Sequence, residues 1–195
     1  MTLRTDLDAL LAEAGLIDVD VDEALEDEHV RTSAYLRVVQ VAAASHGRDQ
    51  DRALVATILR DPYENGSRTA VVALVDAIAR KMTGPAEFRE WADGLLPEIE
   101  RFEGEGHREF IRRRVDDWLF RLSVEDGHVP TAAELAPVTN WMQRLLAEHS
   151  TSAPLLALLA GSGRTRKIRN IAKNRARVTP CACTPSSTTR RITSA

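Results

Sequence analysis

The sequence has few of the residues that commonly reveal a mechanism. Cysteine occurs only at Cys181 and Cys183, so the preceding 180 residues contain neither a disulfide framework nor a thiol nucleophile. No apolar run approaches the roughly 18 residues that a membrane-spanning helix needs. The longest candidate, Ala70 to Val75, stops at Asp76. These absences exclude thiol-dependent enzymes and disulfide-stabilised domains, and they predict no membrane partner.

The sequence also lacks the short motifs of common catalytic and metal sites. It has no glycine-rich phosphate loop, no zinc-protease histidine pair and no serine nucleophile elbow. Cys181-x-Cys183 has the spacing of a metal-binding pair, but it has no second pair and no nearby histidine. The Glu26–His29 and Glu125–His128 spacings resemble half of a di-iron motif, but the second falls in a predicted loop. We therefore predict no catalytic, cofactor or metal site.

The N-terminal residues differ from a secretory signal. They read MTLRTDLDALLAE, with acidic residues among the leucines, whereas a signal peptide has a basic region followed by an apolar one. Together with the scarcity of cysteine, this pattern predicts a cytoplasmic protein.

Charge is distributed unevenly along the chain. All 29 acidic residues precede Arg164, where 17 basic residues accompany them and the net charge is −12; residues 164–195 hold nine basic residues and no acid, a net charge of +9. The most acidic stretch, 18–28, contains seven acids and no base. Such polarity is typical of a tail that binds nucleic acid or an acidic partner, or of two ends of one molecule that attract each other.

Apolar residues recur with the period of an α-helix. In the strongest segment, 67–82, Val71, Leu74, Val75 and Ile78 belong to an apolar arc of roughly 160°. Because so wide an arc must contact at least two neighbours, we predict that this helix is the hub of an all-α protein. Ser67 is its expected N-cap, after a turn over 61–66. Further helices are predicted near 5–14, 27–45, 49–60, 85–102, 107–122, 131–146, 154–160 and 164–177.

We expect about eight to nine helices, in stacked antiparallel pairs, to form one domain over residues 1–177. Residues 18–28 are predicted to be an extended acidic linker, and 178–195, rich in Ser, Thr and Pro, a disordered tail. The pairs start near residues 27, 67, 106 and 150, a spacing of about forty residues that lies in the range of HEAT and armadillo repeats. No residue motif repeats between pairs, so an irregular helical bundle is the alternative to a HEAT-like solenoid.

The predicted helix over 164–177, RTRKIRNIAKNRAR, is the most suggestive binding element. Ile168, Ile171 and Ala172 form a narrow apolar stripe, which leaves the cations mostly facing outward. These candidate contacts to nucleic acid or an acidic partner are Arg164, Arg166, Lys167, Arg169, Lys173, Arg175 and Arg177. Such a face could neutralise phosphates. Alternatively, its cations pair with the acids of 18–28 or remain solvated.

A helix-turn-helix over 155–174 fits poorly. Aligning Gly161 with the glycine of the turn places Lys167 and Asn170 where buried apolar residues should lie. The segment therefore has the order of elements of a helix-turn-helix but not its pattern of buried apolar residues.

Two other patterns have structural interpretations. Arg112–Arg114 resembles an anion clamp, but acids stand four residues from these arginines on both sides, which predicts a helix face of ion pairs. Trp91, Trp118 and Trp141 fall at predicted core-facing positions and are expected to be packing anchors.

The leading hypothesis is a non-enzymatic protein-protein interaction or scaffold protein built on a helical-repeat-like body. The alternative is a nucleic-acid-binding protein that uses the basic helix over 164–177. An enzyme is third, and a carboxylate or histidine with a perturbed pKa in a concave pocket would favour it.

Overall fold

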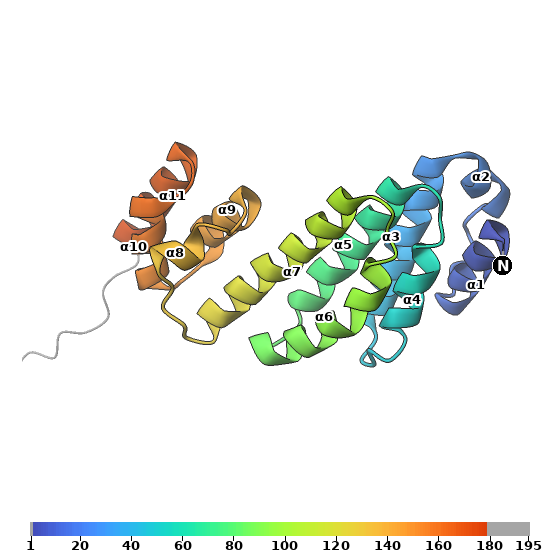
Figure 1. Ribbon diagram of the computed structural model, residues 1–195, viewed down its shortest axis with the longest axis horizontal. Coiled ribbons are helices and arrows are strands. Elements are labelled where there is room, and N and C mark those ends of the chain that lie inside the picture. Colours follow the sequence, from blue (N-terminus) through green and yellow to red (C-terminus); the bar gives the residue numbers. More distant parts are fainter. Residues whose placement is uncertain (1, 179–195) are drawn as a thin grey trace, which may run out of the picture.

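The computed structural model describes residues 2–178, and all regular secondary structure within them is helical. Figure 1 shows the eleven helices of this range arranged in an elongated molecule. They are α1 (Leu3–Glu13), α2 (Val21–Glu26), α3 (Glu28–Ala44), α4 (Asp51–Ile58), α5 (Glu64–Ala79), α6 (Pro85–Ile99), α7 (Glu105–Glu125), α8 (Ala132–Leu135), α9 (Asn140–His149), α10 (Ala153–Ser162) and α11 (Arg166–Val178). The all-α prediction is confirmed. Apart from Val178, the predicted tail 178–195 lies outside the described residues.

The helix count exceeds the expected eight to nine because two short elements were not predicted. One is α2, inside the acidic stretch. The other is α8, which Pro137 separates from α9, since proline disfavours the helical conformation of the residue before it. The capping box predicted at the start of this segment is present, because Thr131 and Glu134 each accept a hydrogen bond from the other's backbone N–H.

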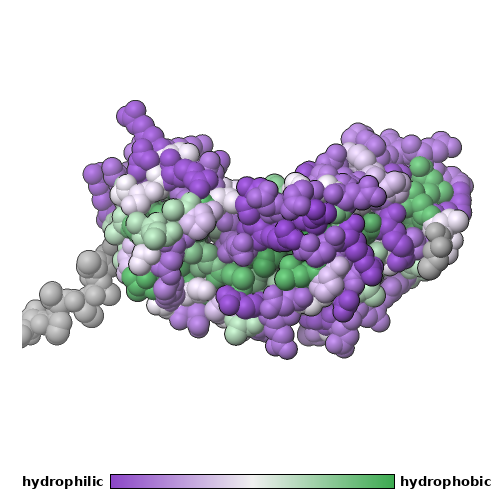
Figure 2. Space-filling model, viewed as in Figure 1, coloured by the Kyte–Doolittle hydropathy of each residue, from purple (hydrophilic) through white to green (hydrophobic). Residues whose placement is uncertain are grey.

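Many of the helices pack on the next helix but one along the chain. α3, α5, α7, α9 and α11 form a row in which neighbours contact each other, and α4 packs on α6 in the same manner. In Figure 1, α1 and α2 lie at one end of this row and α10 and α11 at the other. Figure 2 shows that the outline between the two ends is hollowed on one side and that the residues along this hollow are mostly hydrophilic.

α5 occupies the central position that its wide apolar arc predicted. It contacts α3, α4, α6 and α7. The buried side chains fall into two core clusters, and α5 contributes to both, with Val71 and Leu74 in the first and Val75 and Ala79 in the second. This helix therefore joins the N-terminal and C-terminal parts of the core.

The start of α5 differs from the prediction. The helix begins at Glu64 rather than Ser67, so Asn65-Gly66 is helical and not a turn. Ser67 is no N-cap; it is buried and its hydroxyl donates to the Ile58 carbonyl at 3.0 Å. A Cβ at Gly66 would lie 2.6 Å from Thr32 Oγ1 of α3. Close packing of two helices, which only glycine permits here, therefore overrides the turn preference of Asn-Gly.

The prediction of an extended linker over 18–28 was wrong for residues 21–26, which form α2. Ala24 of this helix is fully buried. Arg31 of α3 holds the end of α2, because its guanidinium donates to the Ala24 carbonyl at 2.8 Å and to Asp61 Oδ2 at 2.6 Å. Tyr35 also donates to Asp61, at 2.8 Å. Acidic composition alone did not reveal this segment as helical, since its fold depends on a buried arginine from the next helix.

Candidate protein-binding surface

Arginine guanidinium groups and aromatic rings alternate on a surface that α5, α7 and α9 share. We call it the arginine–aromatic surface; it consists of Arg68, Arg80, Phe110, Arg114, Arg121 and Trp141, together with Trp118, which is buried beneath the arginines. The closest pair joins α7 to α9, where the Cζ atom of Arg114 lies 3.6 Å from the centroid of the Trp141 ring. The same Cζ atom lies 5.8 Å from the Phe110 ring. A guanidinium over a ring face within about 6 Å is a favourable cation–π contact.

The other arginines continue the pattern on both sides of Arg114. Arg68 of α5 lies 5.1 Å from the Phe110 centroid. Further along, Arg80 and Arg121 lie 5.6 and 5.0 Å from the Trp118 centroid. Trp118 meets the edge of Trp141 at a centroid distance of 6.2 Å. Three helices thus contribute to one continuous set of stacked cations and rings.

Helical periodicity explains why α7 can supply this surface. Phe110, Arg114 and Arg121 are spaced by four and seven residues, so they lie on one stripe of the helix. The neighbouring stripe is buried, and there Ile111 shares a core cluster with Leu95 and Ile99 of α6. The stripe of Phe110 is therefore turned away from α6 and remains accessible.

Two of the rings are exposed to an unusual degree for their size. Phe110 is 41% exposed and Trp141 is 38% exposed. Helical spacing over 107–122 predicts that Phe110 is buried with Ile111 and Val115, and Trp141 is predicted to face the core; both predictions were wrong. The expectation was confirmed for Trp118, which is 1% exposed, whereas Trp91 is half-buried. One signal could have identified Phe110 as an exposed residue. Its helical spacing places it on the same stripe of α7 as Arg114 and Arg121 rather than on the buried apolar stripe.

Positive charge exceeds negative charge on this surface. Asp76 lies within it, and its Oδ1 accepts a hydrogen bond from the Trp118 indole at 2.7 Å, while both of its oxygens lie 3.3–3.4 Å from Arg114. Arg121 is paired with Glu125 at 2.8 Å. Arg68 and Arg80 have no acidic partner within the described range 2–178. Arg68 Nη1 lies 3.3 Å from His107 Nδ1, and its remaining N–H groups and those of Arg80 make no hydrogen bond to an acidic residue in this range. They could donate to the carboxylate of a partner.

The neighbouring arginine run of α7 partly follows the ion-pair prediction. Arg113 pairs with Glu109 at 3.2 Å, as its spacing predicted. Arg112 instead pairs with Glu100, just after α6, and with Glu105, seven residues earlier in α7, while Arg114 turns to Asp76 of α5. Glu100 and Asp76 lie outside α7, so periodicity within one helix cannot show these pairs, which replace the predicted pairs with Asp116 and Asp117.

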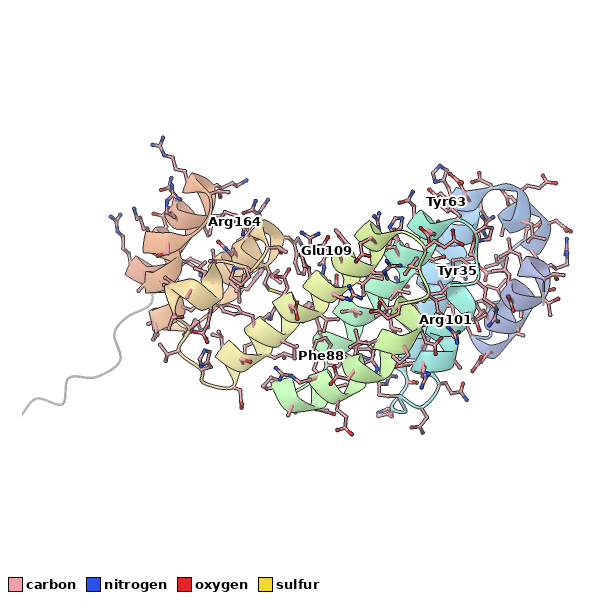
Figure 3. All side chains as sticks on the ribbon, in the orientation of Figure 1. Tyr35, Tyr63, Phe88, Arg101, Glu109 and Arg164 are labelled. Carbon is pink, nitrogen blue, oxygen red and sulfur yellow. The ribbon has the colours of Figure 1, made fainter. Side chains whose placement is uncertain are left out.

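The seven candidate cations at the C-terminus divide into two groups. Three donate to backbone carbonyls: Arg164 to Ala136, Arg169 to Gly163, and Arg175 to Glu148 and Ser150. Figure 3 labels Arg164 at the junction of α10 and α11. These side chains fix α11 against α9 and the ends of α8 and α10, so they serve the fold.

The remaining four cations of α11 are exposed. Arg166, Lys173 and Arg177 lie on one stripe at spacings of seven and four residues, and Lys167 lies beside it. The same outward face carries Asn170 and Asn174 and no acid. Opposite it, Ile168 and Ala172 are buried against α10.

Pairing of these cations with the acids of 18–28 does not occur. α2 and α11 lie at opposite ends of the molecule (Figure 1). Within the acidic stretch, Asp18 pairs with Arg37 at 2.6 Å and Asp22 with Arg4. The alternative that the cations of 164–177 pair with the acids of 18–28 was therefore wrong; Arg190 and Arg191 lie outside the described residues.

A cleft of about 830 Å³ between α6, α7 and the segment around α8 bears on the enzyme hypothesis. Burial raises the pKa of Asp117, which lines it. However, both carboxylate oxygens of Asp117 are occupied by Thr139, which donates from its backbone N–H at 2.9 Å and from its hydroxyl. Asp117 thereby holds the start of α9, a structural role, and His128 in the same cleft is paired with Glu134 at 3.0 Å.

Between residues 2 and 178, no group of three or more His, Cys, Asp or Glu side chains could hold a metal ion. Within the same range, no helix is long and apolar enough to cross a membrane. Comparison of the chain with family models, with curated proteins and with solved structures gave no match.

Proposed function

We propose that this protein is a non-enzymatic binding or scaffold protein, in which a HEAT-like stack of helices presents the arginine–aromatic surface to another protein. The observation that carries the proposal is the exposed Trp141 ring held against Arg114 at 3.6 Å. Tryptophan, tyrosine and arginine are the residues most enriched among those that dominate binding energy at protein interfaces.

The stacked geometry prepares the arginines for a partner. A guanidinium that lies on a ring has lost much of its rotational freedom before binding, so less entropy is lost when a partner contacts its N–H edge. A guanidinium that stacks on a ring can still use its N–H edge for hydrogen bonds to a carboxylate. Arg114 and Arg121 use theirs for Asp76 and Glu125, so Arg68 and Arg80 are the arginines that a partner would contact. The fold thus supports recognition of planar carboxylates.

The charge of the surface favours an acidic partner segment. Arg68 and Arg80 lack acidic partners among residues 2–178, and the rings of Phe110 and Trp141 are exposed between and beside the cations. A segment with aspartate or glutamate next to an apolar side chain matches both features. Charge pairs at the edge would accelerate association and make it sensitive to salt.

The test is binding of the full chain to a peptide array in which Asp/Glu-rich sequences with one aromatic residue are paired with their Asn/Gln counterparts. The expected result is selective binding of the acidic peptides, reduced at least tenfold by Trp141→Ala combined with Arg114→Ala. Arg113→Ala is the matched control, because it removes one exposed arginine from the same helix outside the surface. Equal binding by the double variant would contradict the proposal.

A second candidate function, nucleic-acid binding through α11, is favoured by the exposed stripe of Arg166, Lys173 and Arg177. Replacing these three residues with glutamine should weaken oligonucleotide binding and reduce the dependence of log K on log salt by up to about three. Substitution is a better test than deletion of α11, because deletion would expose the apolar residues of α10. Unchanged affinity in the triple variant would reject this function.

A further inference from the structure

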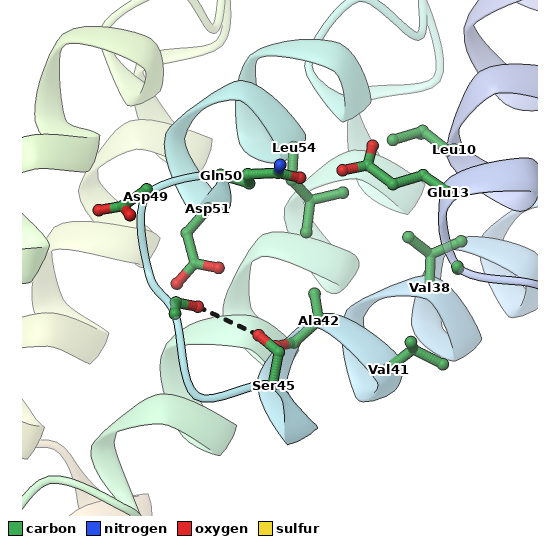
Figure 4. Close-up of a pocket in the computed structure, with 12 residues that line it drawn as sticks. Leu10, Glu13, Val38, Val41, Ala42, Ser45, Asp49, Gln50, Asp51 and Leu54 are labelled. Atoms are coloured by element: carbon green, nitrogen blue, oxygen red, sulfur yellow. Dashed lines mark hydrogen bonds between the residues drawn. The ribbon is translucent and has the colours of Figure 1, made fainter.

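A pocket of about 440 Å³ lies between α1, α3 and the start of α4, away from the helices that form the arginine–aromatic surface. Figure 4 shows side chains from these three elements facing one another across it. Its apolar wall includes Leu10 of α1, Val38 and Val41 of α3, and Leu54 of α4. The volume lies in the range of pockets that hold small organic ligands.

The charged groups that line this pocket have one sign. They are Glu13, Asp49 and Asp51, and no lysine, arginine or histidine lines it. An apolar wall with only carboxylates at its border disfavours an anion and complements a cation that carries an apolar chain.

Asp51 is the carboxylate best placed to fix such a cation. Its side chain is only 5% exposed, and burial raises its pKa. Both of its protein partners approach the same oxygen: the Trp91 indole donates to Oδ2 at 2.9 Å and Arg48 lies 3.3 Å from Oδ2. Oδ1 accepts no hydrogen bond from a described residue and is not among the buried atoms that lack a partner. This oxygen is therefore open to the pocket that Asp51 lines.

Arg48 offsets only part of the charge of Asp51. Its guanidinium also donates to the carbonyls of Ala42 and Ser45, at 2.7 and 2.9 Å, and to that of Gly47 at 2.9 Å. These bonds use its Nε and Nη2 atoms, whereas Nη1, which faces Asp51 Oδ2, makes no hydrogen bond to a described residue. Arg48 does not line the pocket. A buried carboxylate whose second oxygen is unpaired gains from a further charge-assisted hydrogen bond.

We propose that this pocket binds a primary alkylammonium compound, with the ammonium group donating to Asp51 Oδ1 and the alkyl chain lying on Leu10, Val38 and Leu54. Glu13, at the border of the pocket on α1, adds negative potential. A neutral alcohol would fill the same apolar space with a weaker hydrogen bond to Oδ1, and a carboxylic acid would meet like charge. This site is independent of the proposed protein-binding function.

The experiment is calorimetric titration of the full chain with n-butyl-, n-hexyl- and n-octylammonium at neutral pH. Affinity should rise about fourfold for each added methylene until the pocket is filled. 1-Hexanol should bind at least tenfold more weakly than n-hexylammonium, and hexanoate should not bind.

Two variants with a matched control test the assigned contacts. Asp51→Asn should reduce n-hexylammonium affinity by about tenfold or more, while Asn can still accept from Trp91. Asp8→Asn removes the same charge from an exposed side chain of α1 that does not line the pocket, and it should change affinity less than about twofold. Ala42→Met, which fills the pocket from α3, should abolish binding of every chain length.

Some results would overturn the proposal. They are equal affinity for n-hexylammonium and 1-hexanol, equal losses in Asp51→Asn and Asp8→Asn, retained binding in Ala42→Met, or no heat of binding for any alkylammonium in the wild-type chain. Thermal unfolding of each variant, measured alongside, separates loss of the site from loss of the fold.

Discussion

The guanidinium of Arg114 on α7 lies over the ring of Trp141 on α9, with its Cζ atom 3.6 Å from the centroid of the ring. The contact joins two helices that are separated in sequence by α8 and two loops, and it leaves the tryptophan 38% exposed. The arginine itself is mostly buried, with 14% of its side chain exposed, and it also pairs with Asp76 and lies near a second ring, Phe110. The exposed part of this contact is therefore the Trp141 ring, which lies against a fixed guanidinium.

Replacing Trp141 should affect binding more than stability. Because the ring is partly exposed, Trp141→Ala should cost only about 1 kcal/mol of unfolding free energy, less than the 3–5 kcal/mol typical of a buried tryptophan. Urea denaturation of Trp141→Ala and of Trp118→Ala, whose ring is fully buried, provides the comparison. Equal losses in the two variants would show that Trp141 is a core residue and not an interface residue.

Gly66→Ala should destabilise the protein by about 1–3 kcal/mol, because the new methyl group would meet Thr32 and Tyr63 at 2.6 and 2.9 Å. Gly94→Ala is the matched control. Gly94 also lies inside a helix, α6, but a Cβ there meets no atom within 4 Å, so alanine should stabilise by about 0.5–1 kcal/mol. Thermal or urea unfolding measures both changes, and the same sign in both variants would argue against the tight α3–α5 contact.

Asp61→Ala should destabilise the protein by about 3–5 kcal/mol, since it leaves the buried guanidinium of Arg31 without its charged partner. The side chains of Arg31 and Asp61 are 8% and 1% exposed. Tyr35→Phe, which removes only the hydroxyl that donates to the same carboxylate, should cost about 1 kcal/mol. Urea unfolding of the two variants compares their losses of unfolding free energy. Small and similar losses would mean that the hydrogen bonds of Arg31, Tyr35 and Asp61 contribute little to the stability of the core.

Asp6 should make stability fall at acid pH. Arg60 donates to both oxygens of its carboxylate, at 2.9 and 2.6 Å, and these hydrogen bonds lower the pKa of Asp6 below its ordinary value of 3.8. The unfolded chain therefore binds the proton more readily, so this contribution is present above about pH 4 and is lost as pH falls through the lowered pKa. Between pH 7 and roughly pH 3, the urea midpoint of Asp6→Asn should therefore decrease less than that of the wild-type chain. An unchanged pH profile would contradict the assignment.

The basic residues of α11 should separate into structural and exposed groups. Arg175→Gln should lower the unfolding temperature, because Arg175 donates to the Glu148 and Ser150 carbonyls at 2.7 and 3.0 Å. Arg177→Gln removes the same charge two residues later, where the side chain is exposed, and should leave the unfolding temperature nearly unchanged. Equal shifts measured by calorimetry would reject this division.

Local periodicity determined the helical class of this protein. Apolar residues at helical spacing predicted α5 as the hub, and capping chemistry predicted the start of α8 at Thr131, because both depend on residues within a few positions of each other. The same signals failed where a distant partner decides the outcome. α2 depends on Arg31, and the first turn of α5 depends on the approach of α3 at Gly66.

The candidate sites required the tertiary structure. Composition showed that Arg114, Phe110 and Trp141 exist and that basic residues gather at the C-terminus, and sequence patterns predicted that both aromatic residues are buried. Only the packing of α7 between α5 and α9 turns them to the surface and stacks them, and only the contact of α1 with α3 and α4 brings Leu10 to the pocket of Asp51. Whether a segment forms a helix depends mainly on residues close together in the sequence. Which faces of the helices stay exposed depends on which helices pack together, and therefore on the whole chain.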